Sequence, residues 1–276
     1  ATIVNSAGRE NISSGGTAIS TTVNTSGIQY VSLGGLASSA TLSGGTQTLS
    51  GTNAIAISTL ISTGGSQQIL SGGIASATVI NSGGIENISS GGLASGATIN
   101  SSGTQNIYSA GIASGATISA SGIQNISNGG SAVSTIVNSA GTENISSGGT
   151  ALSTTVNTSG IQYVSLGGLA SSATLSGGTQ SVLSGGTALN AQIASGGDQI
   201  VNGGAIVSGA NLLSGGTQGL QSGASVTSTT VNTGATQAVG NAGIAISSIL
   251  SGGVQNITSG GSATATIISS GGIENI

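Results

Sequence analysis

The chain has 276 residues, of which 52 are glycine, and it contains no Pro, Cys, Met, Trp, Phe or His. Only 2% of the residues are charged, and Arg9 is the single basic one against five acidic ones. This composition excludes an aromatic core, a disulfide framework, imidazole or thiolate metal ligands and the basic patch that nucleic-acid binding requires. Hydrophobic residues still make up 36% of the chain, and their fixed spacing argues against disorder.

A repeat of nineteen residues fills the chain. Its clearest copy is 131–149, SAVSTIVNSAGTENISSGG, and the next copy is 150–168, TALSTTVNTSGIQYVSLGG. A fixed period near twenty residues is typical of solenoids, in which each repeat packs only on its neighbours. We therefore predict an all-β fold, a right-handed parallel β-helix built from about fourteen such coils, with the hand taken from the rule for parallel crossovers.

The copies can be followed in chain order. The chain begins part-way through a copy, at 1–16. Full copies run 17–35, 36–54, 55–73, 74–92, 93–111, 112–130, 131–149 and 150–168, and two shorter ones follow at 169–186 and 187–204. The phase shifts over 205–243, recovers at 244–261, and the chain stops mid-copy at Ile276. Because no break in composition marks a second domain, we expect one repeat array over 1–276, a fragment of a longer protein.

A longer duplication lies over the short repeat. Residues 2–47 match residues 135–180 at a constant offset, with only Arg9 facing Thr142 and Ile19 facing Leu152 as differences. Copying whole blocks of coils is compatible with a solenoid, since each coil contacts only its neighbours.

Side-chain alternation within a strand predicts which positions of a copy face inward. We place positions 2, 5, 7 and 15 inside, as ladders of Ala, Thr or Ala, Val or Ile, and Ile or Val, stacked at about 4.8 Å. Gln at position 13 shares the parity of position 15, and we expect it to form an amide ladder along one edge. Position 12, for example Ile85, is expected to face outward.

The sequence argues against a catalytic function. With no His, Cys or Lys, a serine nucleophile has no usual base. The four glutamates, Glu10, Glu86, Glu143 and Glu274, replace Gln at position 13. The closest of them, three coils apart, are separated by about 14 Å, whereas glycosidase carboxyl pairs lie within about 5 to 9.5 Å. The glycine motifs match neither a phosphate-binding loop nor a dinucleotide fingerprint. We expect no catalytic residue, no metal site and no cofactor.

The units TxVNSGGxQxIxSGGxA resemble the nineteen-residue repeats of self-associating autotransporter adhesins of the AIDA/TibA group. The Ser-rich form NSAGTENISSGGTALSTTVNTSGIQYV is most similar to the TibA type. The resemblance implies an exported passenger, displayed on the Gram-negative outer membrane by a C-terminal barrel that, like the signal peptide, is absent from this sequence. It also implies autoaggregation, biofilm formation, virulence and adhesion to host cells. Members of the group are O-heptosylated by a dedicated cytoplasmic heptosyltransferase that uses ADP-heptose.

Serines beside the Gly-Gly corners are the expected heptose acceptors. A transferase needs a hydroxyl on a projecting, open backbone, and corners meet this need better than strands. The first candidates are the second serines of SSGG, namely Ser14, Ser90 and Ser147. The next are serines of similar SGG corners, namely Ser71, Ser82, Ser184, Ser214 and Ser251.

Two other functions remain open at this point. An ice-binding solenoid would need an outward Thr-x-Thr row, yet position 6 varies among Thr, Ile, Val and Leu. An inert spacer that lifts another domain off the cell surface would need no modification. Regular heptose additions would favour the adhesin passenger over both alternatives.

Overall fold

The computed structural model describes residues 1–240, 242–258 and 260–276. These residues form 44 strands, and they contain no helix long and apolar enough to cross a membrane. The chain divides into two compact units: unit 1 is Ala1–Ile136 with Ala140–Glu143, and unit 2 is Val137–Ser139 with Asn144–Ile276. Each unit is a stack of β-solenoid coils, and the chain makes about fourteen turns of about nineteen residues, which confirms the predicted fold class.

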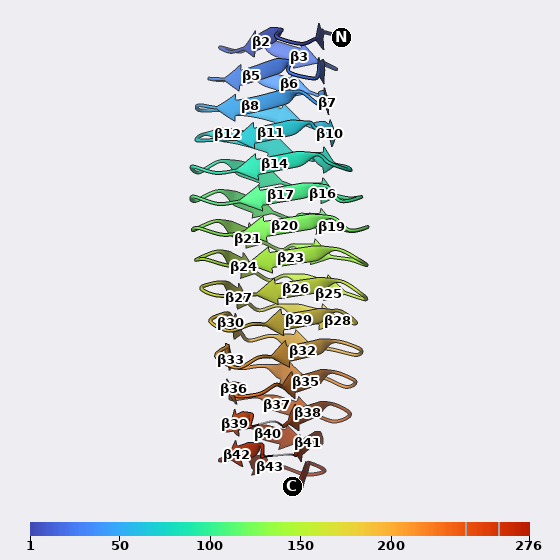
Figure 1. Cartoon of the computed structure of the whole chain (residues 1–276), viewed down its shortest axis with the longest axis vertical. Helices are drawn as coiled ribbons and strands as arrows, with labels where there is room; N and C mark the ends of the chain where they lie inside the picture. The colour runs from blue at the N-terminus through green and yellow to red at the C-terminus, as the bar shows by residue number, and fades with distance from the viewer. Residues whose placement is uncertain (241, 259) are drawn as a thin grey trace. The chain divides into compact units, whose positions relative to one another are not determined.

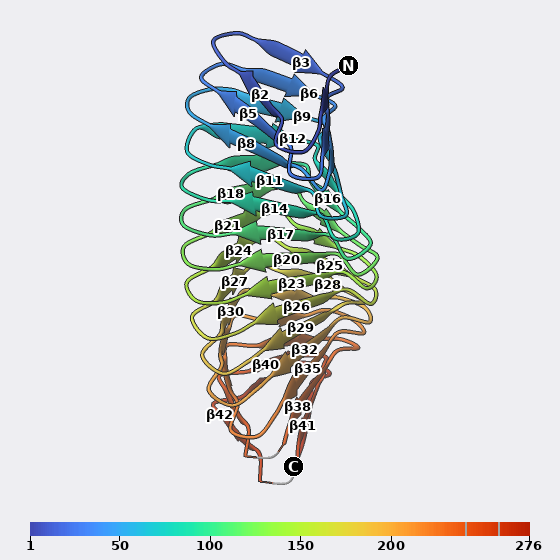
Figure 2. The same ribbon diagram turned by 45° about the horizontal axis from the view of Figure 1, so that its top comes forward.

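Each coil gives one short strand to each of three parallel sheets, here called A, B and C. In unit 1, for example, one coil runs through β13 (Val79–Ile80) of sheet A, β14 (Ile85–Ile88) of sheet B and β15 (Leu93–Ser95) of sheet C. Strands of successive coils pair in parallel, so that β13 pairs with β16 (Thr98–Ile99) in the register Val79↔Thr98. The two views of unit 1 show its coils stacked one on the next (Figures 1 and 2).

The strands of sheet A come from the T-x-V segments of the repeat. In unit 1 they are β1 (Ile3–Val4), β4 (Thr22–Asn24), β7 (Thr41–Ser43), β10 (Leu60–Ser62), β13, β16 and β19 (Thr117–Ile118). In unit 2 they are β25 (Thr155–Asn157), β28 (Thr174–Ser176), β31 (Gln192–Ile193), β34 (Asn211–Leu212), β37 (Thr230–Asn232), β40 (Ile249–Ser251) and β43 (Ile267–Ile268).

The strands of sheet B come from the Q-x-I segments. In unit 1 they are β2 (Arg9–Ile12), β5 (Ile28–Ser32), β8 (Thr46–Ser50), β11 (Ser66–Ile69), β14, β17 (Thr104–Ile107) and β20 (Ile123–Ile126). In unit 2 they are β26 (Ile161–Val164), β29 (Thr179–Val182), β32 (Asp198–Val201), β35 (Thr217–Leu220), β38 (Thr236–Val239), β41 (Val254–Ile257) and β44 (Ile273–Asn275).

The strands of sheet C carry the alanine of position 2. In unit 1 they are β3 (Thr17–Ile19), β6 (Leu36–Ser38), β9 (Ala54–Ile57), β12 (Gly73–Ser76), β15, β18 (Ile112–Ser114) and β21 (Ser131–Val133). In unit 2 they are β24 (Thr150–Leu152), β27 (Leu169–Ser171), β30 (Thr187–Leu189), β33 (Ile206–Ser208), β36 (Ser225–Thr227), β39 (Ile244–Ile246) and β42 (Ser262–Thr264). The division between the units passes through β22 (Ile136–Val137) and β23 (Thr142–Ile145).

The predicted inward positions form the core. In the coil that begins at Ile74, Ala75, Thr78, Ile80 and Ile88 are at most 2% exposed, whereas the outward Ile85 is 40% exposed. No single coil could bury these few small side chains, so the core exists only because neighbouring coils cover one another. The assignment of positions 2, 5, 7 and 15 to the interior is confirmed.

The expected glutamine ladder is confirmed, but it lies inside the coils and not along an edge. Gln67, Gln105 and Gln124 are fully buried. Where glutamines follow one another, the Nε2 atom of one donates to the Oε1 atom of the glutamine in the preceding coil, with N–O distances of 2.5 to 2.6 Å at Gln67, Gln124 and Gln199. Hydroxyls at position 5 add a second donor, as where Thr59 Oγ1 donates to Gln47 Oε1. An amide can lie inside because its neighbours in the stack satisfy it.

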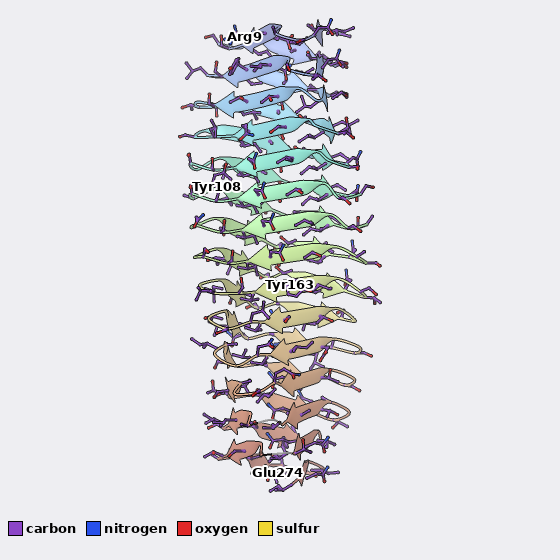
Figure 3. All side chains as sticks on the ribbon, viewed as in Figure 1. Arg9, Tyr108, Tyr163 and Glu274 are labelled. Atoms are coloured by element: carbon purple, nitrogen blue, oxygen red, sulfur yellow. The ribbon has the colours of Figure 1, made fainter. Side chains whose placement is uncertain are left out.

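The outer faces carry scattered side chains. Tyr108 of unit 1 is partly exposed, and Tyr163 of unit 2 is 37% exposed (Figure 3). Half-buried asparagines form a second, outer ladder, in which Asn106 Nδ2 donates to Asn87 Oδ1 at 2.9 Å. These outer rows vary in residue type more than the interior ones.

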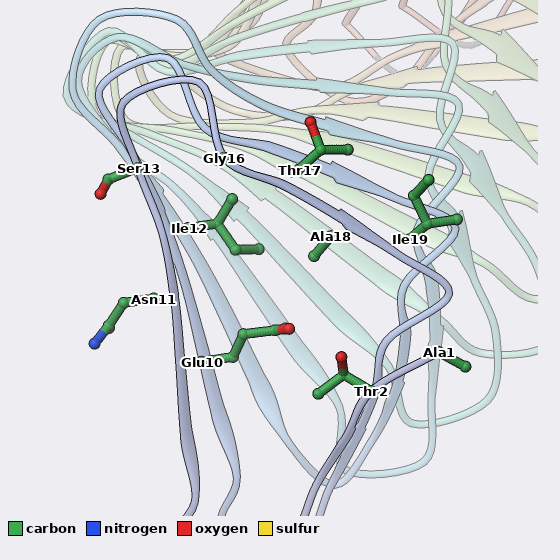
Figure 4. A pocket seen from close by; sticks show the side chains of 10 residues that line it. All are labelled: Ala1, Thr2, Glu10, Asn11, Ile12, Ser13, Gly16, Thr17, Ala18 and Ile19. Carbon is green, nitrogen blue, oxygen red and sulfur yellow. The ribbon is translucent and has the colours of Figure 1, made fainter.

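The first coil of unit 1 leaves a hollow beside its inward side chains. The hollow is lined by Glu10, Ile12, Ala18 and Thr2 among others (Figure 4). Glu10, Ile12 and Ala18 occupy ladder positions that are covered on both sides in the coils that follow. The hollow is therefore an uncovered layer of core, and its residues give no pattern of convergent polar groups.

Candidate functional site

The corner between sheets B and C, which we call the B–C corner, is a tight turn. At Ser90 it consists of Ser89, Ser90, Gly91 and Gly92, and the Gly92 amide donates to the Ser89 carbonyl at 2.9 Å. Both central residues have positive φ, +54° at Ser90 and +79° at Gly91, as in a type I′ turn. The turn therefore holds a serine in the left-handed region, which residues other than glycine occupy at a cost of about 1–2 kcal/mol.

The three first-ranked serines share this geometry. Ser14 has φ +50° and Ser147 has φ +46°, each followed by a glycine with φ near +80°. The turn hydrogen bonds are equivalent, from Gly16 to Ser13 and from Gly149 to Ser146. The SSGG sequence thus specifies one backbone conformation in both units.

Backbone hydrogen bonds between coils hold the corner, while the serine hydroxyl stays outside. The Ser90 amide donates to the Ser109 carbonyl of the next coil at 2.7 Å, and the Ser14 amide donates to the Leu33 carbonyl at 2.8 Å. All eight candidate serines are exposed. Within the part of the chain that the structure describes, none of their hydroxyls makes a hydrogen bond. A rigid backbone therefore presents free hydroxyls.

The five second-ranked serines occupy different environments. Ser71 and Ser184 lie at the B–C corner, and Ser82 and Ser214 lie at the corner between sheets A and B, which we call the A–B corner. In these four turns only the following glycine has positive φ. Ser251 ends strand β40 and takes part in no such turn. The structure brings Ser71 and Ser90 together on consecutive coils and leaves the A–B serines on another corner.

The two glycines of the corner are required for different structural reasons. A Cβ added to Gly91 would meet nothing within 4 Å, so this glycine serves the positive φ and leaves open space beside Ser90. A Cβ added to Gly92 would lie 2.3 Å from the carbonyl oxygen of Ile69 in the preceding coil. The second glycine is therefore required by the close stacking of coils.

Sequence reasoning missed serines with the same backbone outside the Gly-Gly context. Ser109 has φ +48° at the B–C corner and is exposed, although its turn reads Tyr-Ser-Ala-Gly. Ser101, at the A–B corner, has φ +47° and is also exposed. The phase of the repeat, rather than flanking glycines, was the signal that could have identified them.

The carboxylates do not form a site. Among the described residues, no group of three or more Asp, Glu, His or Cys side chains could hold a metal ion. Glu86 and Glu143 are fully buried in the ladder. Burial raises the pKa of Glu86 above its ordinary value, against the hydrogen-bonding groups of Gln105 and Thr78 beside it, which lower it. An exposed serine hydroxyl can accept a group that an enzyme transfers to it, the enzyme supplying the base.

The fold is a glycine- and serine-rich β-solenoid of stacked parallel coils, and its exposed serine hydroxyls lie at the turns. No family model matches the chain, and no curated protein matches it. Among solved structures, the chain is similar to the crystal structure of a TibA fragment that had been hyper-glycosylated by TibC. The two are 37% identical, the match covers 99% of this chain and 94% of that one, and the TM-score is 0.87. The chain belongs to the family of TibA-type autotransporter passengers.

Proposed function

We propose that this chain is the repeat region of an exported adhesin passenger and an acceptor of O-linked heptose on its corner serines. The observation that carries the proposal is the free, exposed hydroxyl on a hydrogen-bonded, left-handed corner, repeated at Ser14, Ser90 and Ser147. The glycosylated state of the similar TibA fragment supports glycosylation as the modification.

The repeat suits an enzyme that acts many times on one substrate. Acceptors on consecutive coils, such as Ser71 and Ser90, lie about 4.8 Å apart along the stack. Ser109, one coil after Ser90, has the same left-handed backbone, with φ +48° against +54°. A transferase that recognises one such corner therefore meets an equivalent one on the next coil. In the transfer, the serine Oγ attacks the anomeric carbon of ADP-heptose, the bond to ADP breaks, and the hydroxyl proton passes to a base of the enzyme.

The partners follow from this assignment. The first is a cytoplasmic autotransporter heptosyltransferase of the TibC kind, which modifies the chain before export. After export the passenger lies on the Gram-negative cell surface, where we expect it to associate with other copies and with the host cell surface. The chain itself is substrate and adhesin, not enzyme.

Intact mass tests the proposal. The chain is expressed with TibC in cells that make ADP-heptose, and separately with a TibC variant that lacks activity. We expect a ladder of masses separated by one heptose residue in the first case only. A variant with alanine at all eight candidate serines should lose most of the added mass. An unmodified wild-type chain would refute the proposal and leave the inert spacer or the ice-binding solenoid.

A further inference from the structure

Glu86 interrupts the buried ladder of unit 1. Strand β14 places it between Gln67 of β11 and Gln105 of β17, in the registers Gln67↔Glu86 and Glu86↔Gln105. On one side the ladder continues, because Gln105 Nε2 donates to Glu86 Oε2. On the other side Glu86 Oε1 is buried and has no hydrogen-bond partner. Apart from Thr21 Oγ1, it is the only such side-chain atom among the described residues.

The neighbouring coils show which atom should stand at that place. One coil earlier, Gln67 Nε2 donates to Gln47 Oε1 at 2.5 Å, and Thr59 Oγ1 donates to the same oxygen at 3.2 Å. The equivalent acceptor beside Glu86 is Gln67 Oε1, which receives only the Thr78 hydroxyl, at 3.1 Å. Glu86 therefore sets an oxygen where Gln67, one coil earlier, has an N–H donor.

The buried groups around Glu86 include one more hydrogen-bond acceptor than the donors can satisfy. Gln67 Oε1 and Glu86 Oε1 are two buried acceptors, and the one hydroxyl beside them, on Thr78, can donate to only one of them. A carboxylate would leave an acceptor unsatisfied in a dry interior, which is costly. A carboxylic acid supplies the missing donor, because its O–H occupies the place of an amide N–H.

We propose that Glu86 is held in the folded chain as a neutral carboxylic acid whose O–H donates to Gln67 Oε1, so that loss of this proton makes its coil a pH-sensitive weak point of unit 1. No other ionisable side chain faces it. The strands packed around it, from β11 to β17, contain no other Asp or Glu and no Lys, Arg, His, Cys or Tyr, and Glu86 is the only ionisable residue between Tyr30 and Tyr108.

The direction of the pH effect follows from proton linkage. The folded chain keeps the Glu86 proton at pH values where the unfolded chain has lost it, because burial raises the pKa of Glu86 above its ordinary value of 4.5. Stability from this group is complete below about pH 4.5 and declines as the pH rises toward the folded-state pKa. In that window the unfolding equilibrium constant should rise about tenfold per pH unit.

The substitution Glu86→Gln tests the proposal, because it restores the amide found in most other coils. Unfolding of the 276-residue chain is compared with that of E86Q from pH 4 upward. We expect the ratio of their unfolding constants to grow with pH by up to tenfold per unit, with E86Q the more stable in neutral and alkaline solution. Parallel pH profiles would overturn the proposal.

Infrared spectroscopy of the folded protein gives an independent readout. The difference spectrum of wild type minus E86Q at neutral pH should contain the C=O stretching band of a protonated carboxylic acid. Asp198→Asn is the matched control, since it removes a carboxylate on the surface of unit 2 that accepts from Thr217. The band should persist in D198N. A carboxylate band in place of the acid band in the E86Q difference spectrum would overturn the proposal.

Discussion

The interior ladder and the B–C corner recur in the same coils and accept very different residues. In unit 1 the ladder position holds only glutamine or glutamate, from Glu10 to Gln124. The second residue of the B–C corner is instead variable: it is serine in most coils of unit 1 but Leu33, Thr52 or Asn128 in others. The ladder side chain must satisfy two neighbours without water, whereas the corner side chain points into solvent. The interior thus defines the coil, and the corner is free to carry function.

A charge in the interior should have the largest effect. Ile99 is fully buried, so Ile99→Asp places an unpaired carboxylate inside unit 1 and should lower the free energy of unfolding by about 3–5 kcal/mol. Ile107→Asp should behave alike. The matched change on the outer face is Ile85→Ser, which should cost about 1 kcal/mol or less. Equal losses in chemical denaturation would show that the two faces have been assigned wrongly.

Breaking the amide ladder should have an intermediate effect. Gln218 donates to Gln199 Oε1 and accepts from Gln237 and from Thr229. Gln218→Leu leaves these groups unsatisfied and should cost about 1–3 kcal/mol. The control is Gln221→Leu, the same change at an exposed position of unit 2, for which we expect a change within about 0.5 kcal/mol. If the two variants unfold at the same denaturant concentration, the ladder does not stabilise the fold.

Changes at the corner should have the smallest effect. Ser90→Ala removes an exposed hydroxyl without a hydrogen bond and should change the unfolding free energy by no more than about 0.5 kcal/mol. Gly91→Ala, one residue further, has space for the new Cβ but must keep φ at +79°, and should cost about 1–2 kcal/mol. A larger loss from S90A than from G91A would mean that the serine is structural.

The sequence was sufficient to predict the coil and which of its side chains point inward, because the nineteen-residue period and the alternation around Ile80 and Ile88 can be packed in only one way. It did not predict that Gln67 and its equivalents lie inside the coils. Parity alone does not say that an amide lies inside, since burial is favourable only when the stack supplies a partner in register. It also missed Ser109, whose left-handed backbone is set by hydrogen bonds to the next coil rather than by a following glycine pair.

The ranking of the acceptor serines depends on the backbone conformation of the corner. Ser14, Ser90 and Ser147 were ranked first for their SSGG sequence, and the structure gives them a backbone that Ser71 and Ser82 lack. Ser14 and Ser147 are equivalent positions of the duplicated blocks, which differ only where Arg9 faces Thr142 and Ile19 faces Leu152. If the corner backbone decides modification, this pair should be modified to the same extent.

Site mapping by electron-transfer fragmentation, after co-expression with the transferase, tests the central claim most directly. We predict heptose on the exposed corner serines, with the highest occupancy at Ser14, Ser90 and Ser147 and unmodified hydroxyls at the buried Thr78 and Thr135. Heptose mainly on these inward threonines, or no heptose on any corner serine, would contradict the account.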